Sequence, residues 1–331
     1  MMQQNTPPSD NALVVEDLVV DFALDNAFFK RRMMRAVNHV SFTIPAGQAL
    51  AVVGESGSGK STCARALTRL VNPNHGTMEL DGLDISQSNE SLTRVQLAKQ
   101  LQMIFQDPFG SLNPVHTIAR HIERPIRIHR PELSNEQVQD LVIETLETVG
   151  LTPAQQTAEK FPHELSGGQR QRVAIARALA TGAKYILADE PISMLDVSIR
   201  LGILNLMADM KARGLGFLYI THDIATARYF AERTAVMYVG HMVEWGDSDS
   251  VTQTPKHPYT QLLIQSVPEV GRKSRQGAKK SPSGQIPIWT PESVGCPFVA
   301  RCPKASDLCN QSMPEVTQVS TDHFIRCHHA D

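Results

Sequence analysis

Residues 54–61 read GESGSGKS, a spacing of glycines, one lysine and one serine that suits the binding of phosphate. The segment fits the pattern G-x-x-x-x-G-K-[ST], in which glycines let successive backbone N–H groups turn inward around an anion. Lys60 is expected to reach the β- and γ-phosphates of a nucleotide, and the Ser61 hydroxyl to bind Mg²⁺. The predicted nucleotide-binding residues are Gly54, Glu55, Ser56, Gly57, Ser58, Gly59, Lys60, Ser61 and Thr62.

Three further side chains with suitable chemistry follow apolar segments further along the chain. Asp189 and Glu190 end KYILADE, and His222 ends GFLYITH. Ligands collect at the carboxyl ends of parallel strands, so these side chains are expected near the bound phosphates. We expect Asp189 to hold Mg²⁺ through water and Glu190 to polarise the attacking water as general base. His222 is predicted to be catalytic at the same edge.

The segment LSGGQ, residues 165–169, raises a different question, because it opens a predicted helix with almost no side chain. Such a segment builds no core, but glycines allow a close approach of the backbone to a ligand. The N-terminus of a helix also favours an anion. The chain therefore has two segments suited to phosphate, separated by about a hundred residues. GESGSGKS alone could bind the phosphates of one nucleotide, so the role of the second segment needs an explanation.

The elements that position these residues follow from hydrophobic patterning. Residues 49–54 predict a short strand that runs into the glycine-rich turn, with a helix after it. Residues 12–22 and 36–44 predict antiparallel strands. Residues 91–160 are expected to be largely helical, and a helix follows LSGGQ. The alternating strand and helix patterns over 184–222 predict a mainly parallel sheet with helices on its faces.

Length and charge restrict the number of domains and the kinds of partner that we expect. With 331 residues, we expect one nucleotide-binding unit and an appendage. The formal net charge of -2 gives no field that favours nucleic acid, so none is expected as a partner. No secretory signal or transmembrane segment is apparent, which favours a cytosolic chain. Residues 1–11 are expected to be disordered, and a Pro-, Lys- and Ser-containing stretch over 272–285 is expected to be an exposed linker.

Six motifs, in order, resemble those of the ATPase subunit of an ATP-binding cassette (ABC) transporter: GESGSGKS, FQDP, LSGGQ, ILADEP, SMLD and ITHD. The resemblance covers roughly residues 13–245. It implies an α/β P-loop NTPase fold, with a RecA-like core, an antiparallel β subdomain, a helical subdomain and a small Cys-rich C-terminal extension. The implied domains are an ABC ATPase over 12–250, with the helical part at about 95–180, and the extension over 251–331. ATP and Mg²⁺ are the implied cofactors.

In this family two ATPase subunits meet head to tail, which answers the question raised by LSGGQ. The resemblance implies that this signature segment faces the ATP held by the partner's P-loop. Its helix N-terminus would then hydrogen-bond the γ-phosphate across the dimer. The implied residues are Ser166, Gly167, Gly168 and Gln169.

Three more positions carry over from the family pattern. Gln106 resembles the glutamine that contacts Mg²⁺ and water and reports on the membrane partner, and Asp196 resembles an acid that communicates across the dimer. Phe22 resembles the aromatic that stacks on adenine, although a core role for it, or the nearby Phe28 and Phe29, are alternatives. Met194 stands where the family often has a small residue.

The C-terminal extension narrows the resemblance to one branch of the family. Residues 254–268 and 295–309, together with FQDPFGSLNP, resemble ATPases of oligopeptide, dipeptide and nickel importers. The implied partners are a related or identical ATPase subunit, two transmembrane permease subunits and, indirectly, a periplasmic or extracellular solute-binding protein. The implied location is peripheral, on the cytoplasmic side of the inner membrane. A nickel or antimicrobial-peptide transporter, or a soluble cassette ATPase in repair or translation, are the alternatives.

Four of the five cysteines gather near the C-terminus with the spacing C-x5-C-x6-C-x17-C. Four thiolates can hold zinc or a four-iron, four-sulfur cluster, and the spacing alone does not decide. The family resemblance favours an iron–sulfur cluster over zinc, with unmetallated thiols as a further alternative. The predicted ligands are Cys296, Cys302, Cys309 and Cys327. Terminal histidines could replace one of them: His323, His328 and His329. Cys63 is expected to be a buried helix residue behind the P-loop.

Overall fold

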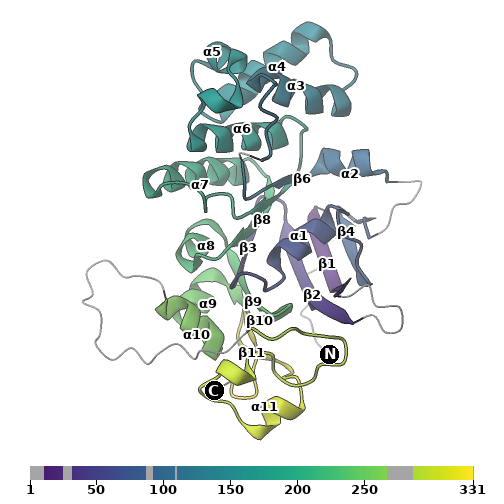
Figure 1. The fold of residues 1–331 in the computed structure, drawn as a ribbon, viewed down its shortest axis with the longest axis vertical. Helices are drawn as coiled ribbons and strands as arrows, with labels where there is room; N and C mark the ends of the chain where they lie inside the picture. The colour runs from purple at the N-terminus through teal and green to yellow at the C-terminus, as the bar shows by residue number, and fades with distance from the viewer. Residues whose placement is uncertain (1–10, 25–31, 87–91, 109, 267–285, 331) are drawn as a thin grey trace.

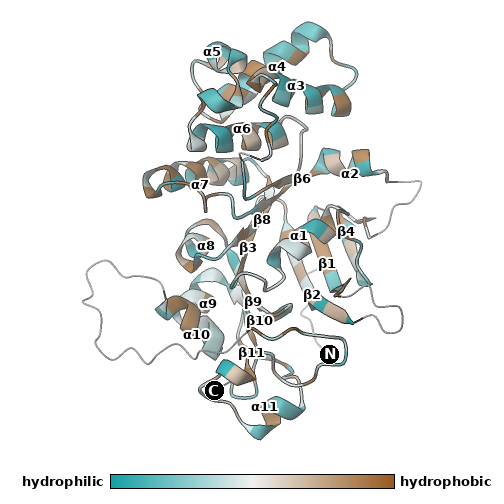
Figure 2. Ribbon diagram, in the orientation of Figure 1, coloured by the Kyte–Doolittle hydropathy of each residue, from teal (hydrophilic) through white to brown (hydrophobic). Residues whose placement is uncertain are grey.

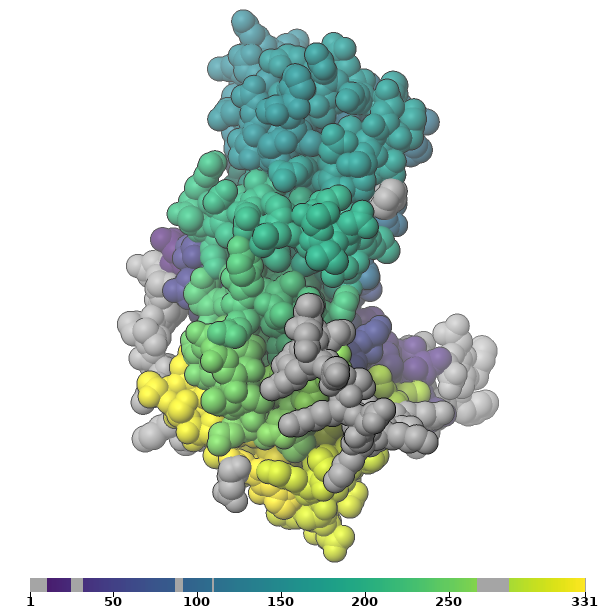
Figure 3. Space-filling view, turned by 90° about the vertical axis from the view of Figure 1, so that its left-hand side faces the viewer, coloured from purple at the N-terminus to yellow at the C-terminus, as the bar shows by residue number. Residues whose placement is uncertain are grey.

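The computed structural model describes residues 11–24, 32–86, 92–108, 110–266 and 286–330. Phe28, Phe29 and the predicted linker at 272–285 lie outside the described residues, as do all but one of the first eleven residues. Figure 1 shows an elongated arrangement, with helices α3–α6 at one end and the C-terminal residues at the other. The space-filling view in Figure 3 shows the same two ends.

The main sheet has eight strands in the order β11-β12-β10-β9-β3-β8-β7-β6. Neighbouring strands from β9 to β6 all run parallel, which confirms the predicted parallel core. The strands are β3 (Ala49–Val53), β6 (Leu101–Ile104), β7 (Tyr185–Asp189), β8 (Gly216–Thr221), β9 (Arg233–Tyr238), β10 (His241–Asp247), β11 (Val316–Ser320) and β12 (His323–Arg326). Figure 2 shows hydrophobic residues along the central strands β3 and β8, as expected of strands covered on both faces.

A second, four-stranded sheet has the order β2-β1-β4-β5. Its strands are β1 (Ala12–Ala23), β2 (Met33–Pro45), β4 (His75–Leu80) and β5 (Leu83–Asp84). The first two strands pair antiparallel, as the sequence predicted. Strand β2 begins three residues before the predicted start at residue 36, and Met34 lies opposite Phe22. Helix α1 lies between the two sheets in Figure 1. Its Cys63 is only 1% exposed, and burial raises the pKa of that thiol to about 12, so the prediction of a buried cysteine is confirmed.

Helices surround the sheets, and three of them begin with a capping box, at Thr93, Ser134 and Ser166. The α-helices are α1 (Lys60–Leu67), α2 (Arg94–Gln100), α3 (Ile118–His129), α4 (Asn135–Thr148), α5 (Ala154–Glu159), α6 (Gly167–Leu179), α7 (Val197–Ala212), α8 (Ile224–Phe230), α9 (Ser248–Gln253), α10 (Pro258–Gln265) and α11 (Asp307–Gln311). Short 3₁₀ turns occupy Pro162–Glu164 and Val299–Arg301. Helix α3 buries isoleucines spaced four residues apart, the pattern of a helix with one apolar face: Ile118, Ile122 and Ile126.

One strand differs from the sequence prediction, and one strand pairing was not predicted at all. Strand β6 lies within the stretch 91–160 that was expected to be largely helical, because four residues are too short for a clear pattern. The C-terminal residues do not form a sheet of their own, since β12 pairs with β10 and extends the main sheet. The fully buried Glu244 of β10 links β12 to the segment before α10. Its carboxylate pairs with His323 of β12 at 2.7 Å and accepts the backbone N–H of His257. No helix among the described residues is long and apolar enough to cross a bilayer.

Candidate functional site

The P-loop connects β3 to α1, and its glycines satisfy steric needs as well as forming a nest for phosphate. Gly59 has a φ of 100°, and a Cβ there would come within 2.2 Å of the Ala36 carbonyl oxygen. A Cβ at Gly54 would meet the Met237 carbonyl oxygen at the same distance. The loop is therefore fitted against β2 and β9, and only glycine allows that approach at either position.

Lys60 is 5% exposed and held inside the loop that precedes it. Its Nζ donates to the carbonyl oxygens of Gly54 at 2.7 Å and Glu55 at 2.9 Å. Burial lowers the pKa of this amine, and the nearby carboxylates of Glu190 and Asp189 act in the opposite direction. The ammonium group thus lies at the loop where an anion would bind, and few water molecules can compete with that anion for its N–H groups.

The donor set expected for Mg²⁺ is assembled at the start of α1. Ser61 Oγ donates to Oδ1 of Asp189, the last residue of β7, at 2.8 Å. Asp189 is 6% exposed, and this burial raises the pKa of its carboxyl group, while the Ser61 hydrogen bond lowers it. A hydroxyl and a carboxylate are oxygen donors of the kind that Mg²⁺ prefers, so these residues fit the ion.

Glu190 is the centre of a second group of side chains. Its Oε2 accepts a hydrogen bond from Gln106 Nε2 at 3.0 Å and lies 3.3 Å from His222 Nδ1. Its backbone has a φ of 47°, which is unusual for a residue with a side chain, and its N–H donates to the Ile220 carbonyl. Because β6, β7 and β8 are parallel neighbours, the residues that follow them meet at one sheet edge.

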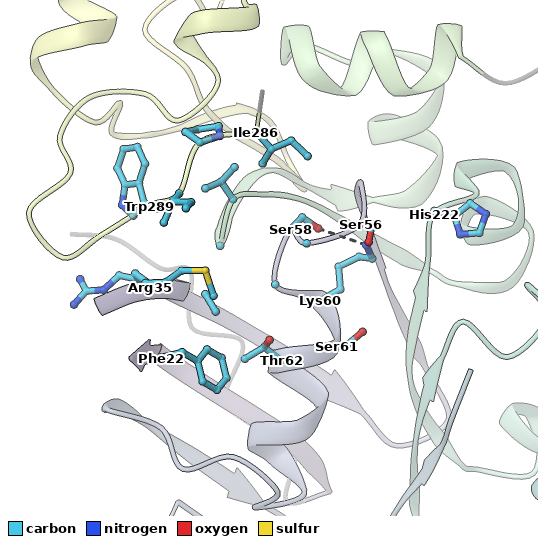
Figure 4. Close-up of a pocket in the computed structure, with 18 of the residues that line it drawn as sticks. Phe22, Arg35, Ser56, Ser58, Lys60, Ser61, Thr62, His222, Ile286 and Trp289 are labelled. Atoms are coloured by element: carbon cyan, nitrogen blue, oxygen red, sulfur yellow. Dashed lines mark hydrogen bonds between the residues drawn. The ribbon is translucent and has the colours of Figure 1, made fainter. Parts of the chain in front are cut away.

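These residues face one cavity of about 590 Å³. Figure 4 shows the P-loop side chains Ser58 and Lys60 along it, with Phe22 and Thr62 on one side and His222 farther along. The lining includes eleven of the predicted residues: Phe22, Ser56, Gly57, Ser58, Gly59, Lys60, Ser61, Thr62, Gln106, Glu190 and His222. Gly54, Glu55 and Asp189 lie just behind this lining, in contact with Lys60 or Ser61. The arrangement can hold a triphosphate at the P-loop and a water molecule near Glu190.

The signature segment lies elsewhere in the same chain, at the N-terminus of α6. Ser166 is exposed and caps the helix, because its Oγ accepts the Gln169 N–H and its own N–H donates to Gln169 Oε1. A Cβ at Gly168 would come within 2.6 Å of Ile199 on α7. Packing against α7 therefore requires this glycine, whatever its relation to phosphate. Asp196, the N-cap residue of α7, is exposed and also outside the cavity lining.

A contact between the C-terminal extension and the P-loop was not predicted from the sequence. Arg301 forms two hydrogen bonds with the Glu55 carboxylate, of 2.8 and 2.9 Å, and its guanidinium lies over the Tyr238 ring. This pairing raises the pKa of Arg301. Tyr259 of α10 accepts the Glu55 N–H at 2.8 Å. The second residue of the P-loop is thus held on its side chain and its backbone by the extension.

We expect Arg301→Ala to lower the free energy of unfolding by roughly 1–3 kcal/mol, because it removes a two-bond pair and leaves a half-buried carboxylate unpaired. Arg301→Lys should recover only part of the loss, since an ammonium group cannot form the paired bonds of a guanidinium. Urea unfolding of the full chain measures both. Unchanged stability in Arg301→Ala would show that the pair contributes nothing measurable.

Among the four late cysteines, the Cys296 N–H donates to the Cys309 carbonyl at 2.7 Å. Burial raises the pKa of the Cys296 thiol to about 11, and the other three cysteines act in the same direction. Their arrangement does not support a metal. Within the described residues, no group of three or more His, Cys, Asp or Glu side chains could hold a metal ion. Cys309 Sγ instead lies 3.8 Å from His329 Nε2 and 3.4 Å from the Ser306 hydroxyl. Neither the predicted iron–sulfur cluster nor the zinc alternative is supported, and nothing below depends on either.

Two family descriptions match the chain: "ABC transporter" over residues 37–193, and "Oligopeptide/dipeptide transporter, C-terminal region" over residues 243–309. The oligopeptide transport ATP-binding protein AppF of Bacillus subtilis is 40% identical, over 96% of this chain and 97% of that protein. The di/tripeptide transport ATP-binding protein DppF of Pseudomonas aeruginosa is 37% identical, over 97% of this chain and 98% of that protein. The dimeric cassette MJ0796, solved in a post-hydrolysis state with ADP and Pi, is 28% identical with a TM-score of 0.61, over 71% of this chain and 98% of that one.

Proposed function

This chain belongs to the ABC transporter ATPases, in the oligopeptide/dipeptide branch, and we propose that it powers a membrane importer of di- or oligopeptides. The observation that carries the proposal is the cavity in which a P-loop lysine, a Ser61–Asp189 pair and a Glu190-centred group converge. The P-loop NTPase fold and ATP hydrolysis follow from the family itself. Peptide cargo is supported by the names of the relatives and by the matching C-terminal region.

Each side chain has a defined task in ATP hydrolysis. The P-loop N–H groups and Lys60 bind the β- and γ-phosphates, and Phe22 stacks on the adenine. Ser61 and Asp189 would hold Mg²⁺, which neutralises phosphate charge when it is bound. Glu190 accepts a proton from the attacking water, and its contacts with Gln106 and His222 keep its carboxylate oriented towards the cavity.

The proposed permease contact is a second cavity, of about 280 Å³, between α2, β6 and α6. Leu70 and Phe105 line it with side chains that are 60% and 40% exposed. Phe105 directly precedes Gln106, so a segment that displaces Phe105 would also move a hydrogen-bond partner of Glu190. We propose that a cytoplasmic segment of a permease subunit binds here. Such a contact would hold the chain at the cytoplasmic side of the membrane. The second ATPase subunit that we propose as a partner would bind through the signature segment.

Cells that lack this chain should lose energy-dependent uptake of labelled di- or oligopeptides. A plasmid copy should restore uptake, whereas Lys60→Ala should not, because its P-loop lacks the phosphate-binding ammonium. Production of both proteins is checked by immunoblotting. Uptake that persists at the normal rate without the chain would contradict peptide import. Loss of nickel uptake in its place would assign the cargo to the metal-transporting alternative.

A further inference from the structure

A short segment of the C-terminal extension forms one side of the nucleotide cavity, although more than two hundred residues separate it from the P-loop. Residues 286–289, which we call the strap, all line this cavity. Figure 4 shows Ile286 and Trp289 of the strap on the opposite side of the P-loop from Phe22. The sequence motifs gave no indication of this position, because the family signature for adenine concerns only the aromatic residue on the first strand.

The strap is fixed in place at its C-terminal end. The Trp289 carbonyl accepts the Arg35 N–H of β2 at 2.8 Å, and the Trp289 side chain is only 9% exposed. Its ring packs edge-to-face on His241, with centroids 4.9 Å apart. His241 is itself held by the Val239 carbonyl and the Asn38 side chain, both at 2.6 Å. The strap therefore rests on hydrogen-bonded groups of β2 and on the buried His241 of β10.

The remaining side chains of the strap are apolar and uncovered. Ile286 is 43% exposed and Ile288 is 59% exposed, yet both line the cavity that contains the P-loop. Pro287 between them fixes one backbone angle and so limits how far the two can move apart. Phe22 and its strand neighbour Met34 supply further apolar surface to the same cavity. Covering water-exposed isoleucines with a flat apolar group is favourable, because it removes their apolar surface from water.

We propose that the strap forms the second wall of the base site, so that the purine base and ribose of the nucleotide lie between Phe22 and Ile288. The phosphates bind the P-loop, while the base covers the exposed isoleucines on one side and the aromatic ring on the other. The C-terminal extension is thereby part of the nucleotide site. It contributes affinity for the base, whereas the P-loop contributes affinity for the phosphates. The proposal goes beyond ATP hydrolysis and holds whatever cargo the importer carries.

The test compares a ligand that has a base with one that lacks it. Full-length Ile286→Ala/Ile288→Ala protein is titrated by calorimetry with Mg²⁺-ATP and with Mg²⁺-triphosphate. We expect the affinity for ATP to fall roughly 10-fold, since two exposed apolar side chains are truncated, while the affinity for triphosphate stays within about twofold. Val294→Ala is the matched control, because Val294 is a 73% exposed apolar residue of the same extension outside the cavity lining. It should bind both ligands like the unaltered chain.

Two results would overturn the proposal. The first is an ATP affinity within a factor of two of the unaltered chain, which would mean that the base does not contact the strap. The second is an equal loss for ATP and triphosphate, which would place the strap at the phosphates or in general stability. Lys60→Ala distinguishes the strap from the P-loop. This variant should lose affinity for both ATP and triphosphate, because both ligands bind the P-loop through their phosphates.

Discussion

A Glu190→Gln variant should bind ATP yet hydrolyse it roughly 10²-fold or more slowly than the unaltered chain, because an amide cannot accept the proton of the attacking water. Glutamine has the same size and keeps an oxygen that can accept the Gln106 N–H at the position now occupied by Oε2. The substitution should therefore leave the cavity intact and remove only the base. Because ATP persists in the site, dimers that form around it should also persist.

Phosphate release measures the turnover, and calorimetry measures the binding of ATP. Glu147→Gln is a suitable control, since Glu147 is an exposed acid on α4 that does not line the cavity. It should hydrolyse ATP at the normal rate. Near-normal hydrolysis by Glu190→Gln would assign the general base to another group. His222, at 3.3 Å from Glu190, would then be the first residue to substitute.

The parts of this site that the sequence predicted share a local cause. A strand that runs into GESGSGKS and then into a helix is a continuous pattern, and its geometry follows from neighbouring residues alone. Asp189, Glu190 and His222 each end an apolar run. Since parallel strands end at one edge, their convergence could be predicted without any knowledge of the strand order. The structure places Glu190 and His222 in the cavity lining and Asp189 directly behind it.

The parts that the sequence did not predict depend on contacts between distant segments. Arg301 and Glu55 are 246 residues apart, and neither has a neighbourhood that indicates a pair. The strap is likewise defined only by where the folded extension returns to β2. Gly168 illustrates a different limit. Sequence can show that a side chain is absent, but it cannot separate close approach to phosphate from packing against Ile199, and the structure shows the second.

The second large effect concerns the site shared between two chains. Ser166 stands at the exposed N-terminus of α6, outside the cavity that its own P-loop forms. The first N–H groups of a helix lack partners within the helix, so they can bind an anion supplied by another chain. A related cassette was solved as a dimer with ADP and Pi. These observations favour a head-to-tail pair in which each nucleotide contacts one P-loop and one signature segment.

We expect two inactive variants to restore one another. Ser166→Arg should block the triphosphate of the partner, and Lys60→Ala should weaken binding at its own P-loop, so neither variant alone should dimerise with ATP. In a mixed dimer, the intact P-loop of the first variant faces the intact signature of the second, which leaves one complete site. Both substitutions are made in Glu190→Gln protein, so that slow hydrolysis preserves the dimers. Glu190→Gln protein alone provides the reference for complete dimerisation.

Size-exclusion chromatography with light scattering measures the outcome. Because neither variant pairs with itself, every ATP-dependent dimer in an equimolar mixture is a mixed dimer. We expect a dimer peak that is absent from either variant alone but smaller than that of the reference protein, because each mixed dimer has one complete site in place of two. Ser166→Ala is the matched control at the signature, because it shortens the cap without filling the space for phosphate and should cost only about 1 kcal/mol of helix stability. If the reference protein dimerises with ATP but the mixture does not, the two features do not share a nucleotide. The γ-phosphate would then have to be bound within a single chain, where no α6 residue lines the cavity.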